Sequence, residues 1–263
     1  MTFGDLLPLL PPEWQSELRA SRVRPVDGGM SGATLYRVQH PDRGDAYLKI
    51  ASGPHLAELR TEIERTTWLA GRGVRVPRLL RVFDDGRAVA VMMSALAGAH
   101  PGDARQPAGD IIRAVAGGLF RLHALPVHDC PFDETVASRL AQARQMMSRG
   151  RVAPEHFADR NRGLAPEDIY DRLMRTRLAG EDLVLVHGDA TFDNILIDPD
   201  QNIGFIDCGH AGRGDRYLDL AAITEAIADH FGPEWVETFA RAYGNIRLDA
   251  ARLAFFSDLY ELF

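Results

Sequence analysis

The chain of 263 residues has two cysteines, one lysine and no apolar run that could cross a membrane. A membrane-spanning helix needs roughly 18 consecutive apolar residues. Cys130 and Cys208 are too few for a disulfide framework or for a cysteine-built zinc site. The first five residues also lack the basic and apolar segments of a secretory signal. We therefore expect a reduced, cytoplasmic protein with no membrane partner.

Basic residues are scarce in the last third of the chain. Residues 181–263 carry 16 acidic and five basic side chains, whereas residues 1–180 carry 21 acidic and 25 basic ones, and the net charge is −7. Because a nucleic-acid surface needs arginine and lysine against the phosphate backbone, this distribution argues against nucleic acid as a partner. It favours metal ions or a polycationic small molecule.

The only lysine is Lys49, and the other 29 basic residues are arginine. A lysine ammonium is a compact charge on a flexible stem, and a planar guanidinium does not replace it at every site. Lys49 therefore either occupies a site that requires an ammonium or is the single lysine left by drift in composition. The count alone leaves both interpretations open.

Apolar periodicity predicts a strand-rich first part and a helix-rich second part. Strands are expected over 33–38, 46–50 and 88–93, with a helix over 56–69. Further helices are expected over 111–123, 136–147, 167–178, 218–231, 234–243 and 249–263, and short apolar strands over 183–186, 195–197 and 203–206. Residues 94–109 are rich in alanine, glycine and proline, which is typical of a linker.

This pattern indicates an α+β fold with two lobes. The expected division is a β-rich N-terminal lobe over 1–94, a hinge over 95–109 and a larger, mainly helical lobe over 110–263.

The densest functional pattern lies between His187 and Asp207. Asp189 follows an apolar strand, Asn194 comes five residues later, and Asp207 ends another apolar strand. This is the spacing of a kinase catalytic loop and its metal-binding acid. A carboxylate such as Asp189 can orient a hydroxyl nucleophile and accept its proton, and the oxygens of Asn194 and Asp207 suit Mg²⁺. Each residue alone could merely cap a turn, but together they favour phosphoryl transfer.

The glycine-rich segment 28–32 lies roughly 20 residues before Lys49. Its backbone and the Ser31 hydroxyl could approach phosphate oxygens, although an ordinary hairpin turn has the same composition. Lys49 followed by Glu62 on the next helix is the order of a phosphate-binding lysine and its glutamate partner. Glu58 and Glu64 compete with Glu62 for that role.

The chain resembles the aminoglycoside phosphotransferases, especially the 3′-phosphotransferase branch, whose fold is a reduced protein-kinase fold. The matching segments are 29–33, 47–49, 68–69, 130–133, 187–190, 205–209, 215–217 and 259–263. They extend from the glycine-rich turn to the last residue. The catalytic segments and the C-terminal tail are specific to the family, whereas the glycine-rich turn is not.

The resemblance implies a role for each matching residue. The nucleotide, ATP with GTP left open, would contact Ser31, Tyr47, Lys49, Glu62, Ser94 and Leu96. Tyr47 would stack on adenine, and the Ser94 carbonyl and Leu96 amide would read its edge. Asp189 would be the catalytic carboxylate, and Asn194 and Asp207 would hold Mg²⁺.

The resemblance also implies where the substrate binds. Glu261 and the carboxylate of Phe263 would hold ammonium groups of the aminoglycoside. His210, Glu225 and Arg160 depart from the family pattern, which usually has arginine at the first two positions and acidic residues around the third. Asp159 and Asp229 remain candidate substrate ligands near these departures. Because all of them concern the substrate pocket, the sequence leaves open which aminoglycosides are accepted.

We therefore expect an ATP- and Mg²⁺-dependent kinase that phosphorylates an aminoglycoside, at its 3′-hydroxyl, and confers resistance. One alternative is a kinase of another small hydroxyl compound, such as a sugar, a choline-like amine or a macrolide. Another is a nucleotide-binding pseudokinase that recognises a basic partner. The acidic C-terminal part argues against a neutral substrate, and the presence of Lys49, Asp189, Asn194 and Asp207 together argues against a pseudokinase.

Overall fold

The computed structural model describes residues 3–26, 32–40, 44–176, 178 and 180–263. The chain divides into two compact units. The first comprises Met1–Ala97 and Phe205–Gly209, and the second comprises Gly98–Gly204 and His210–Phe263. The short segment Phe205–Gly209 thus belongs to the first unit although more than 100 residues of the second unit precede it in the sequence.

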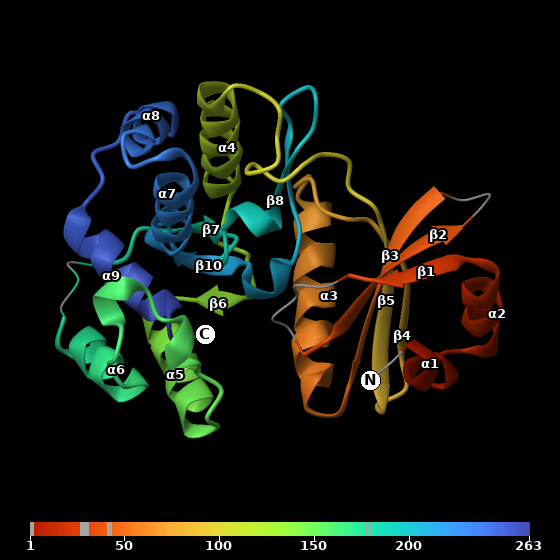
Figure 1. The fold of residues 1–263 in the computed structure, drawn as a ribbon. Coiled ribbons are helices and arrows are strands. Elements are labelled where there is room, and N and C mark those ends of the chain that lie inside the picture. Colours follow the sequence, from red (N-terminus) through yellow and green to blue (C-terminus); the bar gives the residue numbers. More distant parts are fainter. Residues whose placement is uncertain (1–2, 27–31, 41–43, 177, 179) are drawn as a thin grey trace. The chain divides into compact units, whose positions relative to one another are not determined.

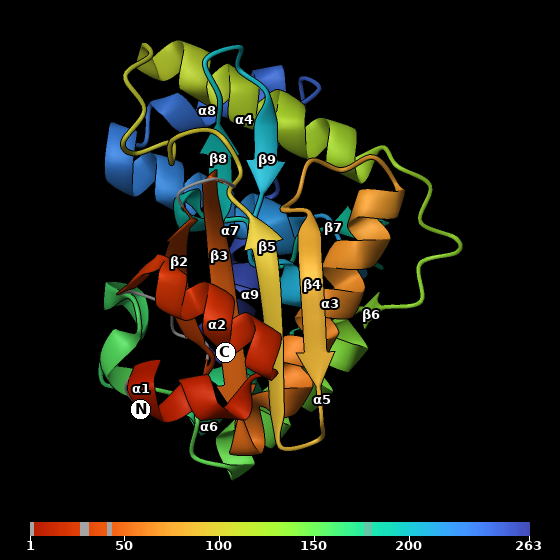
Figure 2. The same ribbon diagram turned by 90° about the vertical axis from the view of Figure 1, so that its right-hand side faces the viewer.

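The first unit is built on an antiparallel sheet of five strands in the order β1-β2-β3-β5-β4 (Figure 1). The strands are β1 (Arg22–Pro25), β2 (Thr34–His40), β3 (Gly44–Ser52), β4 (Leu79–Asp84) and β5 (Ala88–Ser94). Helix α3 (Leu56–Gly71) covers one face, and the N-terminal helices α1 (Phe3–Leu6) and α2 (Pro12–Ala20) cover the other (Figure 2). The apolar run of β5 fits this arrangement, because both of its faces are buried.

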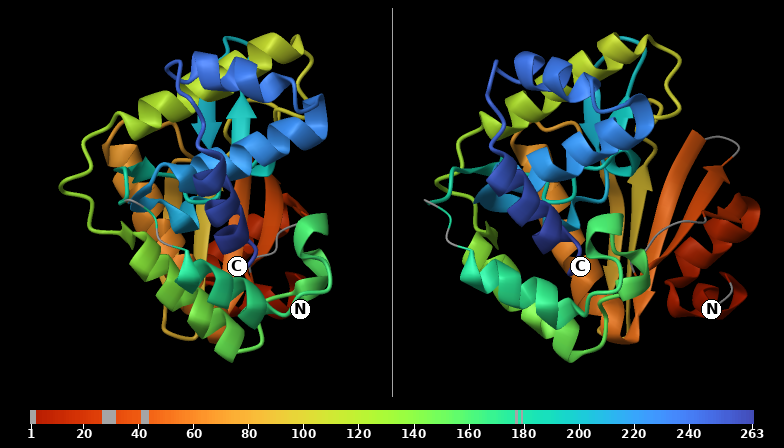
Figure 3. Two further views of the ribbon diagram at one scale, coloured as in Figure 1. Left: turned by 90° about the vertical axis from the view of Figure 1, so that its left-hand side faces the viewer. Right: turned by 60° about the vertical axis from the view of Figure 1, so that its left-hand side comes forward.

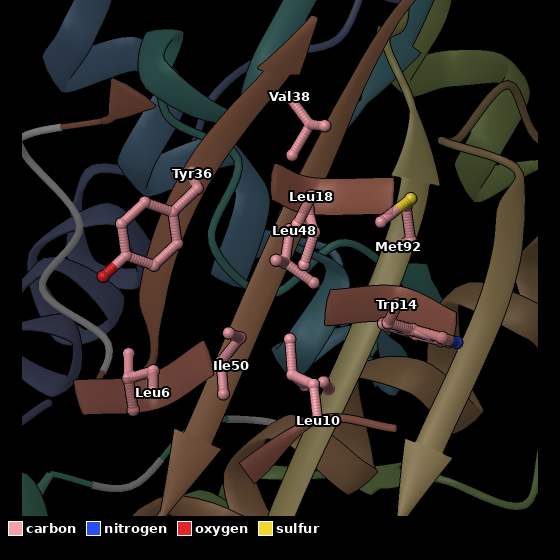
Figure 4. Close-up of a cluster of buried hydrophobic side chains, with 10 residues drawn as sticks. Leu6, Leu10, Trp14, Leu18, Tyr36, Val38, Leu48, Ile50 and Met92 are labelled. Atoms are coloured by element: carbon pink, nitrogen blue, oxygen red, sulfur yellow. The ribbon is translucent and has the colours of Figure 1, made fainter. Parts of the chain in front are cut away.

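Alternation along β3 decides which side chains meet which helix. Leu48 and Ile50 pack with Trp14 and Leu18 of α2 and with Met92 of β5 (Figure 4). Lys49, between them in sequence, therefore points to the opposite face, where α3 lies. The apolar neighbours of Lys49 fix the direction of its ammonium.

The two N-terminal helices are an addition to the strand-rich first part expected from the sequence, in which a helix was predicted only over 56–69. Prolines at 8, 11 and 12 interrupt the helical periodicity of the sequence, yet a proline at the first position of a helix is favourable because its missing N–H needs no partner there. The apolar side chains of these helices are buried on the sheet.

The second unit holds the remaining helices, which Figure 3 shows from two sides. They are α4 (Ala108–His123), α5 (Val136–Ser148), α6 (Pro166–Arg175), α7 (Tyr217–Phe231), α8 (Trp235–Ala242) and α9 (Ala250–Tyr260). Helix α7 packs against α8 and α9, and α4 packs against α8. Helix α4 begins inside the expected linker, and α6 ends three residues before its expected limit because the backbone becomes extended at Thr176.

Short strands accompany these helices. A sheet in the order β6-β10-β7 joins β6 (Asp133–Glu134), β10 (Gly212–Asp215) and β7 (Leu183–Val186), and β8 (Ile195–Ile197) pairs with β9 (Ile203–Phe205). The sequence did not indicate β10, since its Gly-Arg-Gly-Asp sequence has no alternating apolar pattern. Among the residues described, no helix combines the length and the apolar character that a bilayer crossing requires.

Candidate functional site

Lys49 forms a buried ion-pair network inside the first unit. Its Nζ lies 2.6 Å from Oε2 of Glu62 on α3 and 2.9 Å from Oδ1 of Asp207. Glu58 instead contacts His55, and Glu64 is exposed. The structure therefore pairs Lys49 with Glu62 rather than with the two competing glutamates.

Burial and the attraction between opposite charges have opposing effects on the pKa values of this network. Burial disfavours the Lys49 ammonium, but the carboxylates of Glu62 and Asp207 outweigh that effect and raise the pKa of Lys49 above its usual value. Burial is also the main reason that the pKa of Glu62 is raised, against the opposing influence of Lys49. Lys49 thus stays an ammonium with a fixed position, 5% exposed, beside the segment that carries Asp207.

Asp207 has a left-handed backbone, with φ of 57°. Aspartate tolerates this region better than most residues, and such conformations concentrate at functional sites. The N–H of Phe205, two residues earlier, donates to the carbonyl of Arg75 at 2.8 Å, which attaches the segment to the first unit. The Asp207 side chain remains 42% exposed while it accepts from Lys49.

Asp189 lies in the second unit, in the loop after β7. Its Oδ2 accepts a hydrogen bond from Asn194 Nδ2 at 2.7 Å, and the same amide nitrogen lies 3.0 Å from the Asp189 carbonyl. Its Oδ1 accepts a hydrogen bond from the Tyr260 hydroxyl at 2.7 Å. The two side-chain oxygens of Asp189 are therefore held by two different donors, an amide and a phenol.

Asp219 anchors the backbone of this loop. This buried residue near the start of α7 accepts the N–H of His187 and of Gly188, both at 2.7 Å. His123 Nε2 lies 2.9 Å from its Oδ2, so His123 is a buried hydrogen-bonding group. Burial opposes ionisation of Asp219, but its hydrogen bond and charge interaction with His123 hold the pKa of this carboxyl below its usual value.

Gly188 is required by the fold of the loop. Its φ is 80°, and a Cβ at this position would lie 2.2 Å from the carbonyl oxygen of His210. No motif or spacing in the sequence points to Asp219 or to this close approach. The available signal for Asp219 was one acid among the apolar residues that open α7.

Two of the expected substrate residues, Glu225 and Glu261, lie together around Arg160, and the others lie at separate positions. Glu225 on α7 and Glu261 after α9 both contact Arg160, which lies in the short helical turn Asp159–Asn161. Asp159 pairs with Arg162 on the surface, and Asp229 is exposed one turn beyond Glu225. Burial raises the pKa of Glu261, although Asn161 and Arg160 oppose the shift.

The last residue is docked rather than frayed. The guanidinium of Arg139 lies 3.8 Å from the ring centroid of Phe263, and the His210 ring meets the same ring edge-on at 6.2 Å. Arg139 Nη1 also lies 3.0 Å from His210 Nδ1. Arg139 is fully buried, and nothing in the sequence distinguished it from the other arginines.

The remaining nucleotide candidates belong to the first unit. Tyr47 on β3 pairs in register with Met93 of β5, and Ser94 exchanges hydrogen bonds with the backbone of Arg78. Leu96 is half-buried just beyond β5. Ser31 lies outside the described residues.

The donor chemistry of Asn194 and Asp207 fits magnesium. Both Asn194 contacts described above use its amide nitrogen, so the amide is oriented with its oxygen on the other side. An amide oxygen and a carboxylate are hard ligands of the kind Mg²⁺ prefers. Neither residue brings the sulfur or imidazole ligands that favour zinc or copper.

Comparisons with known proteins agree over nearly the whole chain. The model of the "Phosphotransferase enzyme family" matches residues 22–256. An aminoglycoside 3′-phosphotransferase of Streptomyces fradiae is 34% identical over 253 residues, which cover 90% of this chain and 94% of that protein. The crystal structure of an aminoglycoside-3′-phosphotransferase of type VIII superposes with a TM-score of 0.87 and 34% identity, covering 99% of this chain and 98% of that one. The aminoglycoside phosphotransferase APH(3″)-Id of Streptomyces rimosus, in complex with ADP and streptomycin, gives a TM-score of 0.79 and 30% identity, covering 95% and 97%.

Proposed function

The chain belongs to the aminoglycoside phosphotransferases of the phosphotransferase enzyme family, and we propose that it transfers the γ-phosphoryl group of ATP to a hydroxyl of an aminoglycoside, foremost the 3′-hydroxyl. This modification would confer resistance to the antibiotic. The family and the α+β, protein-kinase-like fold class expected from the sequence are confirmed. The similar protein bound to ADP and streptomycin supports a nucleotide donor and an aminoglycoside acceptor.

The proposal rests mainly on the hydrogen bond between the Tyr260 hydroxyl and the Asp189 carboxylate. The Tyr260 O–H donates to Asp189 Oδ1 at 2.7 Å, within the distance at which a general base receives a proton from an alcohol. Asn194 holds the other oxygen, so the carboxylate has one side for orientation and one side for a hydroxyl donor. A substrate hydroxyl in the place of the phenol would have the contact that phosphoryl transfer needs.

The first unit supplies the groups for the nucleotide. The Lys49 ammonium, held by Glu62 and Asp207, would bind phosphate oxygens as a fixed positive charge. Tyr47 would stack on the base, and Ser94 and Leu96 would read its edge through their backbone groups. Residues 1–94, with Ser31 among them, would thus form the nucleotide lobe, 95–109 the hinge and 110–263 the catalytic and substrate lobe.

Asn194 and Asp207 would hold Mg²⁺. The amide oxygen of Asn194 and a carboxylate oxygen of Asp207 would be its protein ligands, and the ion would supply positive charge against the phosphates of the nucleotide.

Asp189 then acts on the acceptor. Its carboxylate orients the substrate hydroxyl and takes its proton as the hydroxyl oxygen forms a bond to the γ-phosphorus. The bond from that phosphorus to the bridging oxygen of ADP breaks on the opposite side, and no phosphorylated protein is formed. Asp219 contributes by holding the loop backbone on which Asp189 is placed.

The acidic groups near the C-terminus would bind the cationic acceptor. Glu225, Glu261 and the carboxylate of Phe263 are the candidates for its ammonium groups, with Asp159 and Asp229 further out on the surface. His210 packs against the ring of Phe263 and would act on the substrate through that residue. A polycation fits this composition better than a neutral sugar or macrolide does.

The test is ADP release from Mg·ATP with kanamycin, neomycin, streptomycin and a panel of neutral hydroxyl compounds. Stimulation by an aminoglycoside, with a product heavier by one phosphate, would support the proposal, and the position of the phosphate would decide the regiochemistry. Asp189→Asn is the matched control, because it should bind ATP normally while turnover falls by about 100-fold or more. Stimulation by neutral compounds alone would move the assignment to another small hydroxyl substrate. ATP binding without any turnover would favour the pseudokinase alternative.

One specific observation favours a second regiochemistry. The structure of APH(3″)-Id with streptomycin matches this chain at 30% identity, so transfer to a 3″-hydroxyl is the second candidate. Phosphorylated streptomycin in the assay above, with no kanamycin product, would support it. The nucleotide preference is resolved in the same assay by replacing ATP with GTP.

A further inference from the structure

The guanidinium of Arg160 lies among three carboxylates of the second unit. Its Nη2 is 2.7 Å from Glu261 Oε1, its Nη1 is 3.0 Å from Glu225 Oε1, and its Nε is 3.5 Å from Asp258 Oδ1. Glu225 belongs to α7, whereas Asp258 and Glu261 lie at the end of α9. One side chain thus contacts all three acids at the position where the C-terminal helix ends.

A second guanidinium and an amide complete the arrangement. Arg172 Nε lies 2.8 Å from Asp258 Oδ2, and Asn161 Nδ2 donates to Asp258 and to Glu261 at 2.9 Å each. The remaining Glu261 oxygen accepts the N–H of Ala158 at 3.2 Å. Both oxygens of Glu261 are therefore already engaged by donors of the chain itself.

We propose that Arg160 is a specificity-determining residue, a built-in counter-ion that competes with the amino groups of the acceptor for Glu225 and Glu261. The inference rests on the proposed function, because it concerns how a cationic acceptor meets these acids. An ammonium that binds Glu261 must displace the guanidinium or share an oxygen with it. Arg160 therefore weakens binding of acceptors that place an amino group here, and it disfavours the most highly aminated ones.

Because the Arg160 side chain is partly exposed, an amino group of the acceptor can displace it from the carboxylates, and Arg160 does not block access to them. Its side chain is 40% exposed, as is that of Glu225, so solvent screens the pair and the guanidinium can turn outward. A purely structural role is already filled by others, since Ala158 and Asn161 attach the same turn to Glu261 and Asp258. The contact between Arg160 and Glu225 does not contribute to that attachment. It places a positive charge beside the partly exposed Glu225 carboxylate.

The experiment compares Arg160→Gln with Arg241→Gln. Both remove one positive charge, but Arg241 pairs only with Glu237 on α8 among the contacts described, and both partners are largely exposed. For Arg160→Gln we expect KM for kanamycin and neomycin to fall by about three- to fivefold, with kcat changed by less than about twofold. The rise of KM with salt should also become steeper, because the pocket has lost a positive charge. Arg241→Gln should leave all of these values at the wild-type level.

Two further variants separate charge from structure. Arg160→Lys keeps the charge and should retain the wild-type KM, whereas Arg160→Met keeps the aliphatic stem without the charge and should behave like Arg160→Gln. KM for ATP should stay constant in every variant, and thermal unfolding shows whether each one is folded.

The outcomes distinguish the inference from the proposed function. If the wild-type protein phosphorylates aminoglycosides and Arg160→Gln leaves KM unchanged or raises it, the inference is overturned and the proposed function stands. The inference is equally overturned if Arg241→Gln lowers KM as much as Arg160→Gln does, since net charge then explains the change. If the wild-type protein binds ATP and phosphorylates no aminoglycoside, the proposed function fails and the inference fails with it.

Discussion

The hydroxyl of Tyr260 lies 2.7 Å from Oδ1 of Asp189 and donates a hydrogen bond to it. Tyr260 is the last residue of α9, three residues before the C-terminus, so the end of the chain reaches the loop that follows β7. Burial first, and then the Asp189 carboxylate, raise the pKa of Tyr260, so the phenol stays protonated and acts as a donor. An acceptor hydroxyl that binds Asp189 must therefore replace or share this bond.

Replacing Tyr260 by phenylalanine should make acceptor binding easier. Loss of one hydrogen bond to a carboxylate that the acceptor would otherwise have to displace corresponds to about 1.5 kcal/mol, or about tenfold in KM. We expect Tyr260→Phe to lower KM for the aminoglycoside by that order while KM for ATP is unchanged, as measured by steady-state kinetics. Tyr170→Phe on α6 removes the same group elsewhere and should change nothing. A large fall in kcat with KM unaltered would show that Tyr260 orients Asp189 instead.

Lys49 should tolerate no substitution. Arginine has a larger, planar group that the site, 5% exposed, does not accommodate, so Lys49→Arg should lose about 100-fold in kcat/KM for ATP. Lys49→Met leaves the Glu62 carboxylate buried without its cation, which should lower the free energy of unfolding by about 3 kcal/mol. Urea titration measures this loss. The double variant with Glu62→Gln should recover part of the stability and none of the activity, and failure to recover any would contradict the pairing.

The pairing of Lys49 with Glu62 was predicted from the sequence, because a strand lysine followed by a glutamate on the next helix is a recognisable order, and the structure has this contact. The roles of Asp189, Asn194 and Asp207 in phosphoryl transfer stay predictions. The strands β7 and β8 were also predicted with correct limits, since short apolar runs bounded by turns leave little choice.

The roles of residues whose partners are distant in sequence could not be predicted. Asp219 looks like an ordinary helical acid until α7 is placed under the loop of His187 and Gly188. Arg139 is one arginine among 29 until its guanidinium is found under the ring of Phe263. Such partners are far apart in sequence, so no local period or spacing encodes them.

Asp219 should contribute to turnover, through the loop that carries Asp189, and to the dependence of stability on pH in the acid range. Asparagine offers one acceptor oxygen to the two N–H donors of His187 and Gly188, so Asp219→Asn should lose about 3 kcal/mol of stability and reduce kcat by at least about tenfold. The pKa of Asp219 is lowered in the folded protein, so it binds fewer protons there than in the unfolded chain. Its contribution is therefore present above the ordinary value of 3.8 and is lost as the pH falls from there through the lower folded value.

The measurement is the free energy of unfolding as a function of pH for the wild-type protein and Asp219→Asn. The two curves should converge below pH 3.8, where the wild-type carboxyl takes up its proton. Asp200→Asn, in the exposed turn before β9, controls for the loss of one acidic charge. Curves that stay parallel down to the lowest pH would contradict the assignment.

Gly188 should be irreplaceable because two separate effects act there. Its φ of 80° disfavours any side chain, and a Cβ would lie 2.2 Å from the His210 carbonyl oxygen, which is backbone and cannot turn away. Gly150 has a similar φ of 62°, but a Cβ there would meet nothing within 4 Å. Gly150→Ala therefore reports the cost of the backbone conformation alone, about 1 kcal/mol.

Gly188→Ala should cost clearly more, about 3 kcal/mol or above, because the loop must also move away from His210. That movement would shift Asp189, the next residue, so turnover should fall by about 100-fold even in protein that remains folded. Thermal unfolding and steady-state kinetics of both alanine variants give the comparison. Equal stability losses at the two positions would show that the contact with His210 is relieved by a small local shift, and near-normal turnover in Gly188→Ala would separate the position of Asp189 from that contact.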